Sequence, residues 1–159
     1  MRDKVYMTEK GYGLLKEELK RLKAHERPKV IKDLAEARAH GDLSENAEYD
    51  AAKERQAFVE GKIKDIEGKL AYAEVIKGKQ GELEKVVFGS NVRLFDLKSE
   101  EEVTYQIVGE DEADIKDGMI SIHSPVARAV IGKTVGEEVV VNVPKGIREF
   151  EILKIFYEE

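Results

Sequence analysis

The chain has 159 residues, of which 42% are apolar and 38% are charged, so it can bury a core while exposing an unusually large polar surface. It contains no cysteine, which excludes disulfides and thiolate metal sites, and its net charge of −6 argues against a general nucleic-acid coat protein. Without a run of about 18 apolar residues or a signal-peptide core, the sequence predicts a cytoplasmic protein.

The first predicted elements are two helices that fold back on each other, with Thr8 as the N-cap of the first. The seam spacing of a coiled coil recurs in two runs, Tyr12, Leu15, Leu19 and Leu22 and then Val59, Ile63, Ile66, Leu70 and Ala73. Members of the runs pair symmetrically about a point between Asp42 and Leu43, beside the helix breaker Gly41. The pattern predicts an antiparallel hairpin with arms of about 30 residues, each about 45 Å long.

Pro28 interrupts the first arm. Proline lacks a backbone N–H, and its ring clashes with the preceding helical turn. The apolar pattern slips by one residue at this point, because Val30, Leu34 and Ala37 each come one position later than the seam requires. We therefore expect a kink or a short break in the helix near Pro28.

The predicted tip of the hairpin, residues 41–46, carries the carboxylates of Asp42 and Glu45. One interpretation is structural, because Asp at an N-cap and Glu at N3 approximate a capping box. The other is chemical: two carboxylates can complete a Mg²⁺ site whose other ligands belong to a partner, since Mg²⁺ often takes only one or two protein carboxylates. Such an ion supports phosphodiester hydrolysis. Composition alone favours capping and leaves both interpretations open.

Three basic residues, Arg38, Lys53 and Arg55, lie near the tip in the sequence. They are either solvated charges paired with acids one helical turn away, or a patch that contacts an RNA phosphate backbone. The sequence favours the first interpretation. His40 is likewise more typical of a helix C-terminus than of a general base.

A second module is predicted after a glycine-rich linker at residues 78–81, so that 1–77 form the hairpin and 82–159 a separate domain. Its apolar residues recur with the period of β-strands. Ser124 followed by Pro125 predicts the start of a short helix. The expected fold is two-domain α+β, with a small antiparallel sheet covered by one helix. The strands are predicted at residues 85–88, 92–97, 103–108, 119–122, 139–143 and 150–157. The net charge is +2 for residues 1–80 and −8 for 81–159, which suggests modules with different partners.

Residues 40–49, with the sequence His-Gly-Asp-Leu-Ser-Glu-Asn-Ala-Glu-Tyr, resemble the tip of the bacterial Gre transcript cleavage factors. Arg27-Pro28, residues 109–114 and residues 120–133 are similar to other segments of that family in the same order. The resemblance therefore covers essentially the whole chain. It implies an N-terminal antiparallel coiled-coil hairpin and a C-terminal domain with an FKBP-like fold.

The resemblance also implies partners and roles. Bacterial RNA polymerase is the expected partner, docked by a loop that Ser124 and Pro125 match, with the coiled coil in the secondary channel. Asp42 and Glu45 match the catalytic pair of the family, which shares Mg²⁺ only within the polymerase active site. The polymerase then cleaves the 3′ end of backtracked nascent RNA. His123 stands where some relatives carry an acidic residue.

In the same resemblance, Arg38 and Lys53 match basic positions near an RNA-binding patch, to which we add Arg55. A protein of this kind is not an enzyme in isolation and is expected to bind no metal by itself. Neither a membrane nor a small-molecule substrate is expected among its partners.

Three other functions fit parts of the sequence. A channel-binding relative that does not stimulate cleavage is expected to depart from the Gre tip pattern, whereas Asp42 and Glu45 are both present. A prolyl isomerase or chaperone is suggested by the FKBP-like domain alone, but such pockets are rich in aromatic residues and residues 81–159 contain no tryptophan. A coiled-coil adaptor would tolerate the loss of both tip acids.

Overall fold

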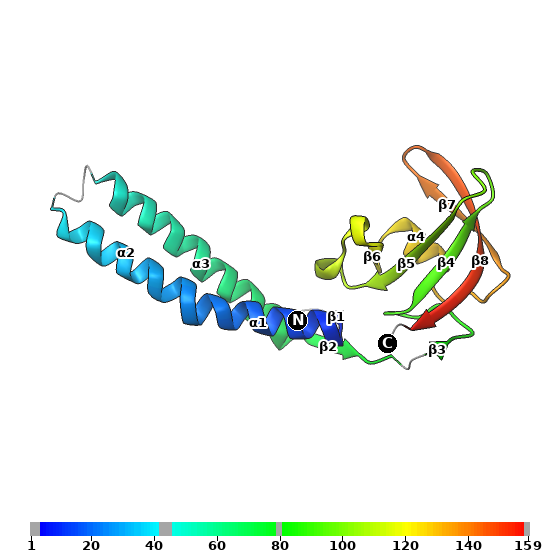
Figure 1. Ribbon diagram of the computed structural model, residues 1–159, viewed down its shortest axis with the longest axis horizontal. Coiled ribbons are helices and arrows are strands. Elements are labelled where there is room, and N and C mark those ends of the chain that lie inside the picture. The colour runs from blue at the N-terminus through cyan, green and yellow to red at the C-terminus, as the bar shows by residue number, and fades with distance from the viewer. Residues whose placement is uncertain (1–3, 42–45, 79–80, 158–159) are drawn as a thin grey trace. The chain divides into compact units, whose positions relative to one another are not determined.

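The computed structural model describes residues 4–41, 46–78 and 81–157 (Figure 1). The chain divides into two compact units. The helical unit comprises Met1–Val5 and Tyr12–Ala73, and the sheet unit comprises Tyr6–Gly11 and Glu74–Glu159. Within the described ranges, no helix is both long and apolar enough to cross a membrane.

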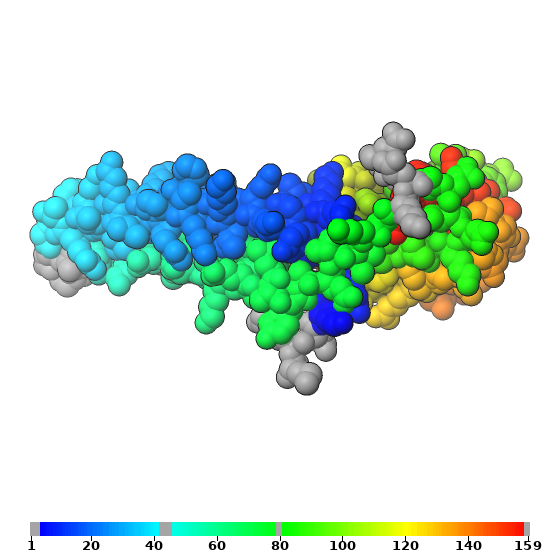
Figure 2. Space-filling view, turned by 90° about the horizontal axis from the view of Figure 1, so that it is seen from below, coloured from blue at the N-terminus to red at the C-terminus, as the bar shows by residue number. Residues whose placement is uncertain are grey.

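The helical unit is a long antiparallel hairpin, as predicted. One arm runs through α1 (Glu9–Arg21), a π-helical turn η1 (Leu22–Glu26) and α2 (Arg27–Ala39), and the other is α3 (Ala47–Ala71). Figure 2 shows the blue and green arms lying against each other along the hairpin. The seam between them buries apolar side chains from both arms, namely Leu22, Val30, Leu34, Ala52, Val59, Ile63 and Ile66.

The irregularity expected near Pro28 is the π-helical turn η1. The backbone N–H of Arg27 donates to the carbonyl of Leu22, five residues earlier, so this turn contains one residue more than an α-helical turn. Pro28 follows in the first turn of α2, where its missing N–H costs least. The extra residue accounts for the slip in the apolar pattern, because Val30 and Leu34 return to the seam and are buried.

Two short strands at the base of the hairpin were not predicted from the sequence. β1 (Val5–Thr8) pairs with β2 (Ala73–Ile76) in a two-stranded sheet. Ala73, expected in the second helix, is therefore in a strand, because α3 ends at Ala71. The strands are only four residues long, too short for a periodicity to be visible.

Thr8 is the N-cap of α1, as predicted: its hydroxyl oxygen accepts the backbone N–H of Gly11 at 3.0 Å. Within the sheet unit, the Glu112 carboxylate accepts the Thr8 hydroxyl, the Thr8 backbone N–H at 3.2 Å and the Gly109 N–H at 2.9 Å. A side chain on Gly11 would collide with this carboxylate, since a Cβ there would lie 1.8 Å from Glu112 Oε1. The start of α1 thus depends on a residue about a hundred positions away in the sequence.

The sheet of the sheet unit has the strand order β3-β8-β4-β5-β6, and β7 also pairs with β8. The strands are β3 (Gly81–Glu82), β4 (Asn91–Asp96), β5 (Glu102–Val108), β6 (Met119–Ser121), β7 (Glu138–Val143) and β8 (Gly146–Tyr157). The sheet is mixed rather than antiparallel as predicted, because β5 and β6 are parallel. The ten residues between them cross over through two 3-10 turns, η2 (Glu110–Glu112) and η3 (Ile115–Asp117), instead of forming a hairpin.

The predicted strand at 85–88 is reduced to a single bridge between Lys85 and Thr134, because the chain turns at Val87, whose carbonyl accepts the Ser90 hydroxyl. The predicted helix is confirmed as α4 (Pro125–Val130), with the Ser124 side chain as its N-cap. The core is formed by the sheet and α4 and contains Val92, Leu94, Ile107, Ala127, Val130, Phe150 and Ile152.

Asp96 ends β4, and its ionised form is stabilised by its neighbours. Hydrogen bonds from the Ser99 N–H, the Arg148 guanidinium and the Lys98 N–H lower the pKa of Asp96 below its usual value of 3.8. A carboxyl whose pKa is depressed by folding stabilises the folded state above its unfolded pKa. That contribution is lost as the pH falls through the folded pKa.

We therefore predict that Asp96→Asn lowers the free energy of unfolding at pH 7, because the amide keeps an acceptor oxygen but not the charge. The difference from the wild type should shrink as the pH falls below about 4 and vanish once Asp96 is protonated. Urea unfolding at a series of pH values measures this difference. A deficit that stays constant down to pH 2 would show that the charge of Asp96 contributes nothing.

Candidate functional site

The candidate site is the tip of the hairpin, between α2 and α3 (Figure 1). The first arm ends with His40 as the C-cap of α2, and the second begins with Asn46 as the N-cap of α3. Asp42 and Glu45, the predicted catalytic and metal-binding pair, lie outside the described residues. The structure thus describes the two ends between which they are held.

Asn46 connects the two arms. Its side-chain oxygen accepts the Tyr49 backbone N–H at 3.1 Å, and its side-chain nitrogen donates to the Ala37 carbonyl on α2 at 2.7 Å. One amide therefore caps the start of α3 and adds a hydrogen bond to a carbonyl at the end of α2 that also accepts the His40 N–H at 3.2 Å. Because α3 begins at Ala47, its N-cap is Asn46 and not Asp42 as the capping interpretation had it, while Asp42 and Glu45 themselves lie outside the described residues. Sequence reasoning missed this role, although asparagine is among the preferred N-cap residues.

Two of the predicted RNA-binding residues meet at one aromatic ring. The Arg38 guanidinium carbon and the Lys53 ammonium nitrogen each lie 5.8 Å from the centre of the Tyr49 ring. Tyr49 and Lys53 are one turn apart on α3, and Arg38 reaches the ring from α2. The ring holds both cations by cation–π attraction, worth about 0.5–1 kcal/mol at an exposed site. We refer to Arg38, Tyr49 and Lys53 as the tip patch.

Arg55 does not belong to the tip patch. It lies two residues beyond Lys53, about 200° further around the helix, and its guanidinium pairs with Asp33 on α2 at 3.4 Å. This is an exposed ion pair between the arms, of a kind that typically contributes little to stability. The structure thus pairs Arg55 with an acid of the other arm, not with one a helical turn away, and groups only Arg38 with Lys53.

His40 is the C-cap of α2, in agreement with the preferred interpretation. Its Nδ1 lies 3.0 Å from a carboxylate oxygen of Glu48 on α3, and both side chains are mostly exposed. Across the part of the chain that the structure describes, no three His, Asp or Glu side chains are grouped to hold a metal ion. The oxygen donors of Asp42 and Glu45 suit Mg²⁺, but two carboxylates leave most of its coordination to other ligands.

The predicted docking residues belong to the sheet unit. The Ser124 hydroxyl oxygen accepts the Ala127 N–H at 3.3 Å, and Pro125 occupies the first turn of α4 with its ring exposed. His123 precedes them and is also exposed. The serine hydroxyl is therefore engaged in the helix cap, while His123 and Pro125 are exposed to solvent. Their docking role remains a prediction.

Asn46 offers a test of how the tip is organised. Asn46→Asp keeps an oxygen for the α3 cap but loses the donor to Ala37 and brings a negative charge to its carbonyl, whereas Asn46→Ala loses both bonds. We expect both variants to destabilise the tip by about 1–2 kcal/mol, with faster hydrogen exchange at the Tyr49 and Asp50 amides. Exchange in Asn46→Asp as slow as in the wild type would mean that the bond to Ala37 contributes nothing.

Comparisons with known proteins assign both halves of the chain to the same group. Residues 5–75 match a family model described as the N-terminal part of a transcription elongation factor, and residues 80–157 match one described as the C-terminal part of GreA/GreB. The chain is 57% identical over 157 residues to transcription elongation factor GreA of Syntrophotalea carbinolica, covering 99% of both chains. It is 58% identical to that of Trichlorobacter lovleyi, covering 99% of this chain and 100% of the relative.

Among solved structures, the chain is similar to the transcription factor Gfh1. The two are 32% identical, with a TM-score of 0.46, and the match covers 98% of this chain and 99% of Gfh1.

Proposed function

The chain belongs to the GreA/GreB family of transcription elongation factors, and from this premise we propose that it stimulates cleavage of backtracked RNA by bacterial RNA polymerase. In this proposal the hairpin enters the secondary channel and brings Asp42 and Glu45 to the polymerase active site. One observation carries it: α3 is capped by Asn46, so the two carboxylates between the arms are not needed for capping. The sequence of residues 40–49 also resembles the tip of this family.

The number of Mg²⁺ ligands determines what this chain and the polymerase would each contribute. Asp42 and Glu45 together supply too few oxygen donors for a closed Mg²⁺ site, so the remaining ligands would come from the polymerase. When bound there, Mg²⁺ activates the attacking water and stabilises the charge that develops on the phosphate. The protein would thus act on RNA only within the polymerase, as a cytoplasmic factor that is not a nuclease by itself.

The tip patch gives the RNA a place to lie beside the carboxylates. Arg38 and Lys53 are exposed and share the Tyr49 ring, which presents two positive charges on one side of the hairpin. A phosphate backbone is attracted to such a pair regardless of its sequence. The sheet unit supplies the contact with the polymerase surface, for which we retain Ser124 and Pro125.

Replacing both tip carboxylates tests the main proposal. We expect Asp42→Asn/Glu45→Gln to reduce RNA cleavage in a stalled, backtracked elongation complex to the level of polymerase alone, because the shared metal site loses its charge. Asp50→Asn is a matched control, since Asp50 is an exposed acid in the first turn of α3. Competition binding shows whether the double variant still occupies the polymerase. An equal loss of binding and cleavage would contradict a chemical role for the pair.

The tip patch is tested by reversing one charge. We expect Lys53→Glu to weaken stimulation most on long backtracked RNAs, where more phosphates can be contacted, and to flatten its dependence on salt. Arg55→Glu provides the control on the other face of α3, and its effect should be small and independent of RNA length. If Lys53→Glu and Arg55→Glu reduced stimulation equally, the proposal that only the face of α3 carrying Lys53 contacts RNA would be contradicted.

A further inference from the structure

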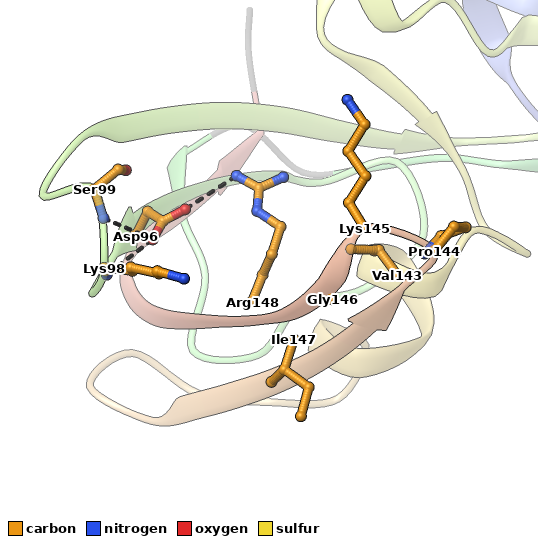
Figure 3. A pocket seen from close by; sticks show the side chains of 9 residues that line it. All are labelled: Asp96, Lys98, Ser99, Val143, Pro144, Lys145, Gly146, Ile147 and Arg148. Carbon is orange, nitrogen blue, oxygen red and sulfur yellow. Dashed lines mark hydrogen bonds and ion pairs between the residues drawn. The ribbon is translucent and has the colours of Figure 1, made fainter.

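A cleft at one end of the sheet has no place in the proposed function. It lies between the turn that joins β4 to β5 and the hairpin that joins β7 to β8, and it has a volume of about 720 Å³ (Figure 3). Neither Ser124 nor Pro125 lines it. The lining residues are Asp96, Lys98, Ser99, Val143, Pro144, Lys145, Gly146, Ile147 and Arg148.

Arg148 is fixed in position at this cleft. Its Nη2 donates to Asp96 Oδ2 at 3.1 Å, and its guanidinium lies 4.7 Å from the centre of the Phe150 ring. Asp96 is fixed in turn by the backbone N–H groups of Lys98 and Ser99, at 2.9 and 3.2 Å. A guanidinium carries five N–H donors, and this arrangement uses few of them. Arg148 therefore presents a preorganised set of donors to an anion.

The cleft is positive within a negative module. Lys98, Lys145 and Arg148 line it against the single acid Asp96, whereas residues 81–159 as a whole have a net charge of −8. In the described part of the chain, neither lysine forms an ion pair. Figure 3 shows the side chains of Lys145, in the turn before β8, and Arg148, on β8, extending to the same side. Charge complementarity calls for an anionic ligand.

The backbone beside the cleft favours a peptide over a bare anion. The Glu149 carbonyl accepts the Leu97 N–H at 3.0 Å, just beyond the end of β4. Because backbone groups alternate along a strand, the N–H and C=O of Ile147 point to the same side, where β4 no longer continues. β8 therefore has a short open edge at the cleft. Val143 and Pro144 lie alongside, and the Ile147 side chain points away from Arg148 (Figure 3).

We propose that this cleft binds a short extended segment of a partner polypeptide that carries a carboxylate side chain between apolar residues. The carboxylate accepts charge-assisted hydrogen bonds from Arg148. It is also attracted by the positive charges of Lys98 and Lys145. The backbone of the segment pairs with the open edge of β8 at Ile147, and its apolar side chains pack on Val143 and Pro144. The surface is additional to the docking residues Ser124 and Pro125.

The test uses the full chain labelled with ¹⁵N and two blocked peptides, Ac-Val-Glu-Val-Asp-Val-NH₂ and its neutral counterpart Ac-Val-Gln-Val-Asn-Val-NH₂. We expect the acidic peptide to shift the amide signals of residues 96–99 and 145–148 with a Kd of about 1 mM or below, and the neutral peptide to bind at least about tenfold more weakly. No shift with the acidic peptide, or equal binding of both peptides, would overturn the proposal.

Substitutions in the cleft and competing anions test whether the acidic peptide binds there. Lys98→Glu/Lys145→Glu should weaken binding of the acidic peptide at least about tenfold, while Lys116→Glu/Lys133→Glu, which changes two lysines of the same module outside the cleft, should leave it unchanged. Arg148 is left intact because it also holds Asp96. Inorganic phosphate or a short single-stranded RNA that binds the cleft more tightly than the acidic peptide would replace the peptide proposal with an anion or nucleic-acid site.

Discussion

The apolar seam between the two arms of the hairpin is the constraint on which the rest of the helical unit depends. Two antiparallel helices stay together only while each apolar position on one arm meets an apolar position on the other. Pro28 threatens this match because an α-helix cannot continue unaltered through a proline. The π-helical turn before it absorbs one residue, so that Val30 and Leu34 return to the seam. The tip is therefore held at the end of two continuous arms.

At the tip, the two arms are joined by the neutral side chain of Asn46. The Asn46 amide both accepts from α3 and donates to α2, which a carboxylate in the same position could not do. Charged groups nearby are consequently available for other purposes. Arg38 and Lys53 are gathered on the Tyr49 ring, while Arg55 is tied to Asp33 on another face. Similar basic residues thus fall into two groups, one gathered on the Tyr49 ring and one that joins the arms through an ion pair.

Local signals explain most of what the sequence predicted correctly. The side chains of Thr8 and Ser124 cap helices through residues three positions away, and each arm of the hairpin shows its own apolar period. The misses depend on distant partners. β1 and β2 are too short to show a period, and the parallel direction of β6 follows from how residues 109–118 cross the sheet, which no alternation of apolar residues encodes. The N-cap of α3 was misassigned for a different reason, because Asp42, Ser44 and Asn46 are all acceptable N-cap residues and only the start of α3 distinguishes them.

The position of β8 in the sheet has a consequence for how the protein is made. β8 pairs with β3, β4 and β7, all of which precede it in the chain. The hairpin arms, by contrast, are complete by Ala71 and are joined by a short tip. During synthesis the hairpin can form while the ribosome is still translating the strands, whereas the sheet must wait for its central strand to emerge. A nascent chain that stalls before β8 is complete would thus carry a folded hairpin and an unfolded sheet unit.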